Sequence, residues 1–383
     1  MVALVRRGFS LRQAAWHLGV GFSTVRRWVQ RAGDTRPERV EWADRSSAPH
    51  HPRRTERELE DRVLKLREVL RETSDLGHYG AIAIWGALQQ EGHPPLPSVR
   101  TIGRILRRRG ALDGRLRVRR PAPPPGWYLP EVASGRRELD SFDCVEGLVI
   151  RGGTAVEVLN GTSLHGGLVM SCPVSILSAK IVAEMLVEHW RQWGLPEYAQ
   201  FDNDTLFQGP HQWADVIGRV SRLCLSLEIA PVFVPPRETG FQARIENYNG
   251  SWQAKVWARF QHGSLAELQE RSQRYVAALR QHRQAQRDAA PSRRPWPSGW
   301  KLDLQAPPRG RLIYMRRTSE QGTVEVLGYT FEVDPHWTHR LVRAEVNLEV
   351  GKIAFYGLRR REPGLQPLLR TIGYIWPRTH FRE

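Results

Sequence analysis

The chain has 383 residues, enough for about two to four domains of ~100–200 residues each. Its 57 Lys and Arg against 40 Asp and Glu give a formal net charge of +17 and a sequence pI near 10.6, which indicates a polyanionic partner, most often nucleic acid. The three widely spaced cysteines exclude a disulfide framework and a zinc knuckle, and the lack of a long apolar run or signal segment predicts a cytoplasmic protein without a membrane span.

The charge is distributed unevenly along the chain. Residues 1–137 hold 27 basic and 14 acidic side chains, a net charge of +13. Residues 138–262 hold 9 basic and 14 acidic side chains, a net charge of −5, and residues 263–383 return to a net charge of +9. Basic ends that hold DNA and an acidic middle that holds a cation would explain this pattern, although a merely soluble scaffold in the middle is the simpler alternative.

Residues 1–33 predict a helix-turn-helix DNA-binding domain. Ser10 and Ser23 are candidate N-caps of two helices, and Gly19 suits a turn that requires a positive φ. In that arrangement the second helix would present four side chains to the major groove or the phosphates: Thr24, Arg26, Arg27 and Gln30. An ordinary helical hairpin is the alternative.

Residues 50–110 predict a second helix-turn-helix DNA-binding domain. Its last helix would begin after Ser98 and turn an apolar side to its partner helix. The exposed side of that helix would carry Arg100, Arg104, Arg107 and Arg108. A solvated arginine face without a ligand is the alternative.

Residues 111–137 predict a stiff linker, because "RRPAPPPGWYLPE" contains five prolines. From residue 138 the pattern becomes three short strands, a helix, a strand, a helix, a strand and a helix. This order is that of the ribonuclease H-like fold, with a mixed five-stranded sheet. The fold class is therefore multidomain, with all-α units preceding an α/β core at 138–262.

Three acidic residues of this core come from separate predicted elements. Asp140 lies in the first strand, Asp202 at the end of the fourth, and Glu246 beside the apolar face of the last helix. Carboxylates that converge repel one another unless they bind hard cations, Mg²⁺ or Mn²⁺. Two such ions can stabilise both the attacking and the leaving oxygen of a phosphoryl displacement. A solvated surface acid is the ordinary alternative for each residue alone.

The blocks "ELD", "FDND…F" and "TGFQARIENYN" resemble those of the DDE transposase and retroviral-integrase superfamily, especially insertion-sequence transposases with an integrase-type core. The resemblance covers about residues 1–262. It implies that Asp140, Asp202 and Glu246 are the catalytic, metal-binding residues and that Mg²⁺ is the cofactor, with Mn²⁺ able to substitute. Asn249, three positions after the glutamate, also matches the family pattern.

Two features depart from that pattern, and one nearby acid is set aside. Asp204 stands where the family usually has glycine, and Glu246 follows Asp202 by 44 residues, a longer step than usual. Asp143 lies three residues after Asp140, so strand alternation puts the two on opposite faces, and only one can face Asp202 and Glu246. The family block favours Asp140.

The last third predicts a helix and basic linker (263–308), a small antiparallel β-barrel (309–360) and a basic tail (361–383). Arginines would line the rim of the barrel: Arg316, Arg317, Arg340 and Arg343. In transposases that this chain resembles, such a barrel contacts DNA or the neighbouring subunit. Packing against the core alone is the alternative.

The resemblance implies a DNA transposase. It would bind the terminal repeats of a mobile element, cut to free a 3′-OH and join that hydroxyl to target DNA. Its partner would be double-stranded DNA, both element ends and target, and it would assemble on DNA as a homo-oligomer. Two alternatives remain: a DNA-binding regulator with an inactive integrase-like core, and a metal-dependent nuclease that does not join.

Overall fold

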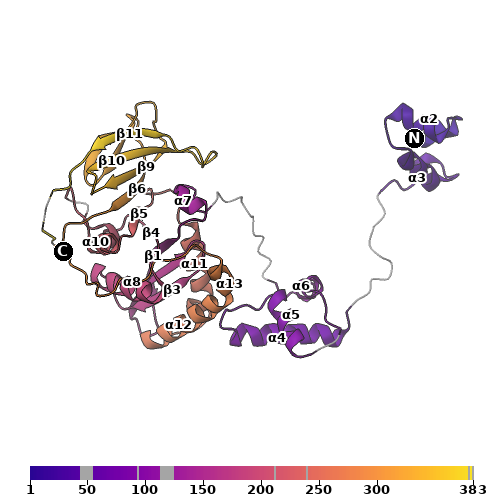
Figure 1. Ribbon diagram of the computed structural model, residues 1–383. Coiled ribbons are helices and arrows are strands. Elements are labelled where there is room, and N and C mark those ends of the chain that lie inside the picture. Colours follow the sequence, from indigo (N-terminus) through magenta and orange to yellow (C-terminus); the bar gives the residue numbers. More distant parts are fainter. Residues whose placement is uncertain are drawn as a thin grey trace. The chain divides into compact units, whose positions relative to one another are not determined.

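The structure is a computed structural model that describes residues 1–43, 55–92, 95–112, 125–210, 213–238, 240–377 and 380–381. The chain divides into two compact units, Met1–Glu60 and Asp61–Glu383, and each is described by itself (Figure 1). None of the described helices is long and apolar enough to cross a membrane.

Residues 1–43 of the first unit form three α-helices and a 3₁₀ turn: α1 (Val2–Arg6), α2 (Leu11–Leu18), α3 (Phe22–Ala32) and η1 (Pro37–Arg39). Ser10 caps α2 as predicted, because its hydroxyl accepts from the Gln13 backbone N–H at 3.2 Å and the Gln13 side chain accepts from the Ser10 N–H at 2.9 Å. Gly19 then ends α2 with a φ of 62°, the left-handed conformation that a turn requires here.

The two predicted helices of this unit pack through small side chains. Ala14, Ala15 and Val25 are buried, so α2 and α3 approach closely. The start of α3 differs from the prediction, because Gly21 occupies the N-cap and Ser23 lies inside the helix. Helix α1 was not predicted; its apolar side chains join the same small core.

Three further helices follow: α4 (Arg57–Thr73), which begins before the division at Glu60, and α5 (Ala81–Gln90) and α6 (Val99–Arg108) in the second unit. The Ser98 hydroxyl caps α6 by accepting from the Thr101 N–H at 3.1 Å, as the sequence predicted. Buried Ile102 and Ile105 lie on the apolar side of α6, which packs on α5. An ion pair of 2.7 Å between Arg109 and Asp61 joins the end of α6 to α4.

The predicted linker is only partly a linker. Its residues 113–124 lie outside the described part of the chain, whereas Trp127, Tyr128 and Leu129 are buried and precede α7 (Pro130–Ala133). The Tyr128 hydroxyl donates to the Gln200 side chain at 2.9 Å. Trp127, Tyr128 and Leu129 pack in one apolar cluster with side chains of the central sheet. The core domain therefore begins before residue 138.

The central sheet has the predicted topology. Its first five strands are β1 (Leu139–Val149), β2 (Ala155–Ser163), β3 (Val169–Val174), β4 (Tyr198–Phe201) and β5 (Ala230–Phe233). Strands β1, β2 and β3 pair antiparallel, and β4 and β5 join the other edge of β1 in parallel, which gives the order β3-β2-β1-β4-β5. This strand order, with helices between β3, β4 and β5, is that of the ribonuclease H-like fold.

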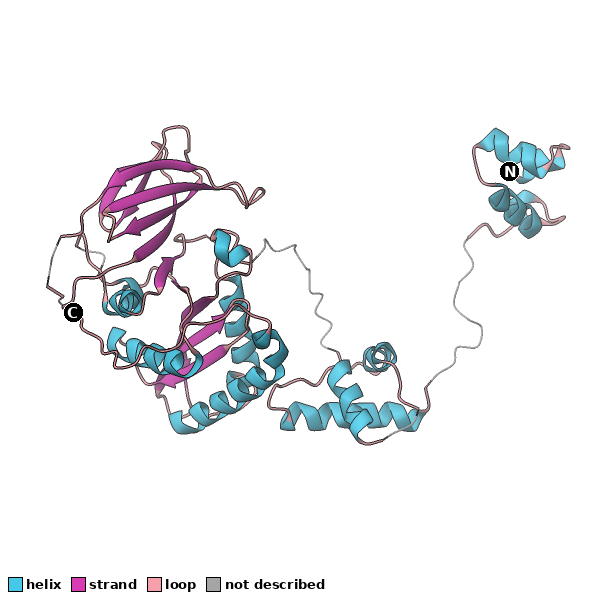
Figure 2. Ribbon diagram, in the orientation of Figure 1, coloured by secondary structure: helices cyan, strands magenta, loops and turns pink. Residues whose placement is uncertain are grey.

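Helices cover both faces of this sheet (Figure 2). One face carries α8 (Ala179–Trp193), α9 (Thr205–Gln208) and α10 (Arg219–Ser226), and the other carries α11 (Ala243–Trp252), the π-turn η2 (Gln253–Trp257) and α12 (Leu265–His282), followed by α13 (Gln284–Asp288). The helix predicted at 211–227 begins only at Arg219, after Gly218. Gly218 lies so close to Gly209 that an added Cβ would come within 2.7 Å of the Gly209 nitrogen.

The C-terminal strands extend the central sheet. They are β6 (Arg311–Arg317), β7 (Thr323–Val326), β8 (Tyr329–Glu332), β9 (Leu341–Asn347), β10 (Lys352–Leu358) and β11 (Leu368–Gly373). Strand β6 pairs in parallel with β5, and β9, β10 and β11 continue the sheet antiparallel, while β7 and β8 form a separate two-stranded ribbon. The predicted separate barrel at 309–360 is thus corrected to a sheet extension, and β11 lies within the predicted tail.

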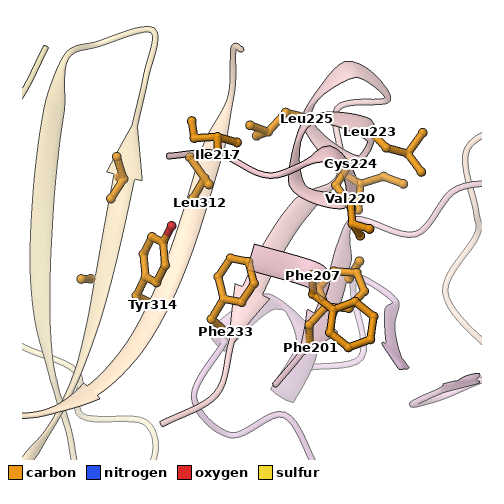
Figure 3. Packing of buried hydrophobic residues seen from close by; sticks show 14 of the residues in the cluster. Phe201, Phe207, Ile217, Val220, Leu223, Cys224, Leu225, Phe233, Leu312 and Tyr314 are labelled. Atoms are coloured by element: carbon orange, nitrogen blue, oxygen red, sulfur yellow. The ribbon is translucent and has the colours of Figure 1, made fainter. Parts of the chain in front are cut away.

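One apolar core links the two parts of the sheet. The rings of Phe233 in β5 and Tyr314 in β6 stack with their centroids 5.1 Å apart (Figure 3). The stacked rings of Phe201 and Phe207 have centroids 4.8 Å apart. All four side chains are almost fully buried and belong to a single cluster with α10. Because the cluster spans β4, β5 and β6, the C-terminal strands are fixed to the core.

Candidate active site

Asp140 is placed by β1 on the face of the sheet that packs against α8. Its carboxylate is 1% exposed and accepts two hydrogen bonds from the Arg293 guanidinium, at 2.9 and 2.6 Å, and one from the Trp190 indole at 3.1 Å. Burial by itself would raise the pKa of Asp140, but the charge and hydrogen bonds of Arg293 outweigh it and lower that pKa. Both carboxylate oxygens are thus occupied by donors.

Asp143 lies on the opposite face of β1, toward α11. Its Oδ2 accepts a hydrogen bond of 2.7 Å from the Asn249 side chain, and its Oδ1 accepts one of 3.0 Å from the Cys144 N–H. Burial raises the pKa of Asp143 to about 6, and the charges of Asp202 and Glu246 add to the rise. Asp143 is therefore an electrostatic neighbour of the two other predicted carboxylates.

The structure does not bring Asp140 together with Asp202 and Glu246. The alternation of β1 separates Asp140 from Asp143 as expected, and the charges of Asp202 and Glu246 act on Asp143, on the face opposite to Asp140. Asp140 instead contacts the half-buried Arg293. Of the two β1 aspartates, Asp143 is therefore the one with Asp202 and Glu246 as electrostatic neighbours.

Asp202 follows β4 at the point where the strand ends, and it is half-buried. Burial raises its pKa, the Asp204 backbone N–H lowers it through a hydrogen bond of 3.0 Å, and the Asp204 charge raises it. The side chain of Asp204 caps α9 by accepting from the Leu206 N–H at 2.8 Å. Asp204, the additional acid beside the site, therefore serves as the N-cap of α9.

Glu246 lies in the first turn of α11 and is exposed. Ile245 and Tyr248 are buried on the same helix, so the apolar face predicted from the sequence fixes the helix against the sheet. Glu246 extends from the border of that face, and its charge contributes to the raised pKa of Asp143.

A buried chain of hydrogen bonds orients Asn249 toward Asp143. The Asn160 side-chain amide in β2 donates to the Asn249 carbonyl at 2.8 Å, and the Ser171 hydroxyl in β3 donates to the Asn160 carbonyl at 2.6 Å. Ser171 also pairs with the Tyr248 hydroxyl at 2.7 Å. With its carbonyl accepting from Asn160, the Asn249 amide group is left to donate to Asp143.

Sequence reasoning missed Asn160, Ser171 and Arg293. The only signal for the first two is a polar side chain inside a strand that is otherwise apolar, in "VLNG" and "VMSC". No sequence pattern distinguishes Arg293, because it is one of four arginines in a segment predicted to be a basic linker. Its partner Asp140 is 153 positions away in the chain.

The donor set fits a hard cation in its chemistry. Three carboxylates offer only oxygen ligands, and a cation would oppose both causes of the raised pKa of Asp143, first its burial and then the charges of Asp202 and Glu246. In the described residues, however, no three His, Cys, Asp or Glu side chains lie close enough together to hold a metal ion. The acids are electrostatic neighbours that would have to move closer to share an ion.

The predicted DNA-contacting residues lie on two helices. On α3, Arg26, Arg27 and Gln30 are exposed and Thr24 is half-buried. On α6, four arginines are exposed: Arg100, Arg104, Arg107 and Arg108. These helices belong to different units.

No protein-family model and no curated protein matches the chain. Among solved structures, it is similar to the catalytic core domain of BIV integrase, at 14% identity over 37% of this chain and 81% of that chain, with a TM-score of 0.28. It is also similar to a simian T-cell lymphotropic virus intasome chain in complex with PP2A regulatory subunit B56 gamma, at 12% identity over 70% and 87%, with a TM-score of 0.34. The strand order and pairing identify the central domain as a ribonuclease H-like fold.

Proposed function

We propose that the chain is a metal-dependent polynucleotidyl transferase of the DNA transposase kind. The observation that carries this proposal is the electrostatic grouping of Asp143, Asp202 and Glu246 on an integrase-like core. The three come from the middle of β1, the end of β4 and the first turn of α11, the positions from which the sequence predicted a catalytic set.

In this proposal Asp143, Asp202 and Glu246 hold Mg²⁺, for which Mn²⁺ can substitute. When bound, such ions neutralise phosphate charge and stabilise the attacking and leaving oxygens of the displacement. Hydrogen bonds from the Asn249 side chain and from the Cys144 N–H hold the two oxygens of Asp143 in a fixed direction. Water is the nucleophile for cutting and the freed 3′-OH for joining, and the protein contributes position and charge rather than a covalent intermediate.

The proposed partner is double-stranded DNA, both the ends of a mobile element and the target. The exposed arginines of α3 and α6 and the net charge of +13 in residues 1–137 support this. Assembly as a homo-oligomer on DNA belongs to the same proposal. The family resemblance and the charge distribution along the chain support this assembly.

A second candidate is a DNA-binding regulator with an inactive core. The observation in its favour is that the three acids do not converge to a metal site in the described residues. A nuclease that cuts without joining differs from the transferase only in its product.

A strand-transfer assay separates these functions. Labelled duplexes that carry the element ends would be incubated with the full chain, Mg²⁺ and a target plasmid. The transferase yields joined product, a nuclease yields cut product alone, and a regulator yields bound but intact DNA. Asp143→Asn, Asp202→Asn and Glu246→Gln should each abolish cutting and joining while DNA binding persists.

The matched control is Asp204→Asn, which changes an acid beside the site that serves as a helix cap. Asparagine is also a good cap, so activity should be retained within a fewfold. Loss of activity in Asp204→Asn with full activity in Asp143→Asn would contradict the assignment of the three carboxylates.

A further inference from the structure

The segment that follows β11 returns to α10. Its first part is attached to the loop before that helix, because the Tyr374 hydroxyl donates to the Asp215 carboxylate at 2.5 Å and the Trp376 indole donates to the Asp215 backbone carbonyl at 2.9 Å. Phe381, farther along the segment, lies at α10 itself. It belongs to no strand or helix, so side chains of other elements hold it in place.

One side chain binds the backbone of Phe381. The Gln305 amide group donates to the Phe381 carbonyl at 3.2 Å, and the Gln305 side-chain oxygen accepts from the Phe381 N–H at 3.1 Å. Two opposite residues of an antiparallel sheet exchange the same pair of bonds, so Gln305 takes the place of a strand residue. This contact uses only backbone atoms of the bound residue and does not depend on its side chain.

The ring of Phe381 lies against two arginines. The guanidinium carbons of Arg219 and Arg222 are 5.6 and 5.3 Å from its centroid, within the range of cation–π contacts. Arg222 is 6% exposed, forms no ion pair with a carboxylate of the described residues, and has a pKa lowered by burial. Its other aromatic neighbour is Trp376, at 5.4 Å. Ring faces therefore stabilise this buried cation, which an aliphatic side chain cannot do.

The arginine and the glutamine are held together by the same hydrogen bonds. The Arg222 guanidinium donates to the carbonyls of Leu304 and Ala306, at 2.9 and 3.3 Å, which are the residues on either side of Gln305. Neither bond involves Phe381. The groups that bind the ring and the groups that bind the backbone therefore keep their positions whether Phe381 is present or not.

Phe381 also lines a cavity of about 390 Å³ between the starts of α8, α9 and α10. Three acids line the same cavity: Glu146, Glu157 and Asp204. Arg219 is the basic residue of this lining, so its net charge is negative. In the sequence, Phe381 has basic neighbours, Arg378 and Arg382. The acidic lining thus favours a basic segment around the bound aromatic residue.

We propose that α10 and Gln305 form a peptide-binding site that recognises one aromatic residue of a basic segment by its ring and its backbone, and that Phe381 of the same chain occupies this site. The inference does not rest on the proposed transferase function. A partner protein that carries such a segment binds here by displacing Phe381. The sheet is unaffected by this exchange, because β11 ends before the displaced residue.

The test measures peptide binding to the full chain, without DNA and in EDTA. A synthetic peptide of residues 377–383 would carry fluorescein, and its anisotropy would be followed during titration with the unsubstituted chain and with the Phe381→Ala chain. We expect a Kd of about 0.1 mM for the Phe381→Ala chain and one about tenfold weaker for the unsubstituted chain. The reason is that a segment tethered beside its own site competes at an effective concentration on the order of 1 mM.

Substitutions in the peptide separate recognition of the ring from non-specific attraction. Phe381→Trp in the peptide should retain or increase the affinity, since tryptophan forms the strongest cation–π contacts, whereas Phe381→Leu should lower it at least about fivefold. In the chain, Gln305→Ala added to Phe381→Ala should weaken peptide binding about tenfold, because both backbone contacts are lost. Lys301→Ala, a change of an exposed side chain in the same linker, should have no effect.

No binding to either chain, or equal affinity for both, would overturn the inference, because a site that Phe381 occupies has to exclude the peptide until Phe381 is removed. A leucine peptide that binds as tightly as the phenylalanine peptide would overturn it as well. None of these measurements depends on cutting or joining, so the strand-transfer assay tests the proposed function separately.

Discussion

Asp140 and Asp143 lie three residues apart in β1, yet their carboxylates have opposite electrostatic surroundings. Asp140 is buried against Arg293, which lowers its pKa, and its ionised form contributes stability that is present above about pH 4 and is lost at lower pH. Asp143 has a pKa raised to about 6, so its ionised form costs stability above that pH, and the cost vanishes as the pH falls toward 4.

These opposite shifts predict opposite effects of the same substitution. Asp140→Asn leaves the half-buried Arg293 charge unpaired and should destabilise the fold by about 3–5 kcal/mol. Asp143→Asn, in EDTA at pH 8, should stabilise it by on the order of 2 kcal/mol, and the gain should disappear near pH 4. Urea denaturation at both pH values measures this. Destabilisation by Asp143→Asn at pH 8 would contradict the cost of burying this ionised carboxylate with Asp202 and Glu246 as electrostatic neighbours.

Asn160 is predicted to be a positioning residue rather than a catalytic one. Asn160→Ala removes the donor that orients Asn249, so Asp143 loses its fixed direction. The Mg²⁺ concentration for half-maximal cutting should rise about 10–100-fold, as is typical of groups that support metal ligands. DNA affinity should be unchanged, and excess Mn²⁺ should restore cutting.

Activity that no concentration of metal restores would instead indicate a collapsed fold. A natural comparison is Thr162→Ala, which removes another buried polar group of β2 that makes no contact with Asn249. That variant should keep its metal dependence.

Which of the two β1 aspartates has Asp202 and Glu246 as electrostatic neighbours could not be predicted from the sequence. Spacing established that Asp140 and Asp143 face opposite sides of the sheet, but not which side carries the site. That depends on Arg293 and on Asn249, which lie 153 and 106 residues away from their partners. Asp202 and Glu246 were easier to place, because each follows from a local pattern: the end of a strand and the border of an apolar helix face.

At the scale of elements, the pairing of β5 with β6 joins the C-terminal strands to the central sheet. Local alternation identified the strands of this region and suggested a separate barrel. The parallel pairing of Val232 with Ile313 and of Phe233 with Tyr314 joins segments about 80 residues apart, a distance at which local pattern carries no information. The helix start at Arg219 and the burial of Trp127 were missed for the same reason, since tertiary packing determines both.

The stacked rings of Phe233 and Tyr314 predict that the C-terminal strands unfold together with the core. Tyr314→Ala removes a fully buried ring and should destabilise the whole core by about 3–5 kcal/mol in urea denaturation. Val350→Ala, an exposed site between β9 and β10, should cost less than about 0.5 kcal/mol. An independent barrel would instead give two transitions, with only one of them shifted by Tyr314→Ala.

At the scale of the whole molecule, the net positive charge lies in segments of the sequence other than the one that carries the candidate site. Residues 1–137 carry a net charge of +13 and residues 138–262 a net charge of −5. Attraction to DNA is therefore supplied mainly outside the acidic core, and the core presents carboxylates that repel phosphate until cations are bound.

This division predicts where the salt dependence of DNA binding originates. In the full chain, replacing Arg26 and Arg27 together with Ala should lower the slope of log affinity against log salt by about two, since each phosphate contact adds ~0.9. Fluorescence anisotropy with a labelled duplex measures the slope. Arg36→Ala, an exposed arginine beyond α3, should leave it almost unchanged. An equal effect of Arg36→Ala would mean that α3 is not the contact surface.

The ion pair between Arg293 and Asp140 also bears on the order in which the chain can fold during synthesis. When β1 leaves the ribosome, Asp140 has no cation to accompany it into the interior, and its partner is made 153 residues later. A buried carboxylate without its counter-charge is too costly to retain. The helices of the N-terminal third can therefore fold as they emerge. The core, in contrast, can bury Asp140 of β1 only after residue 293 has been synthesised.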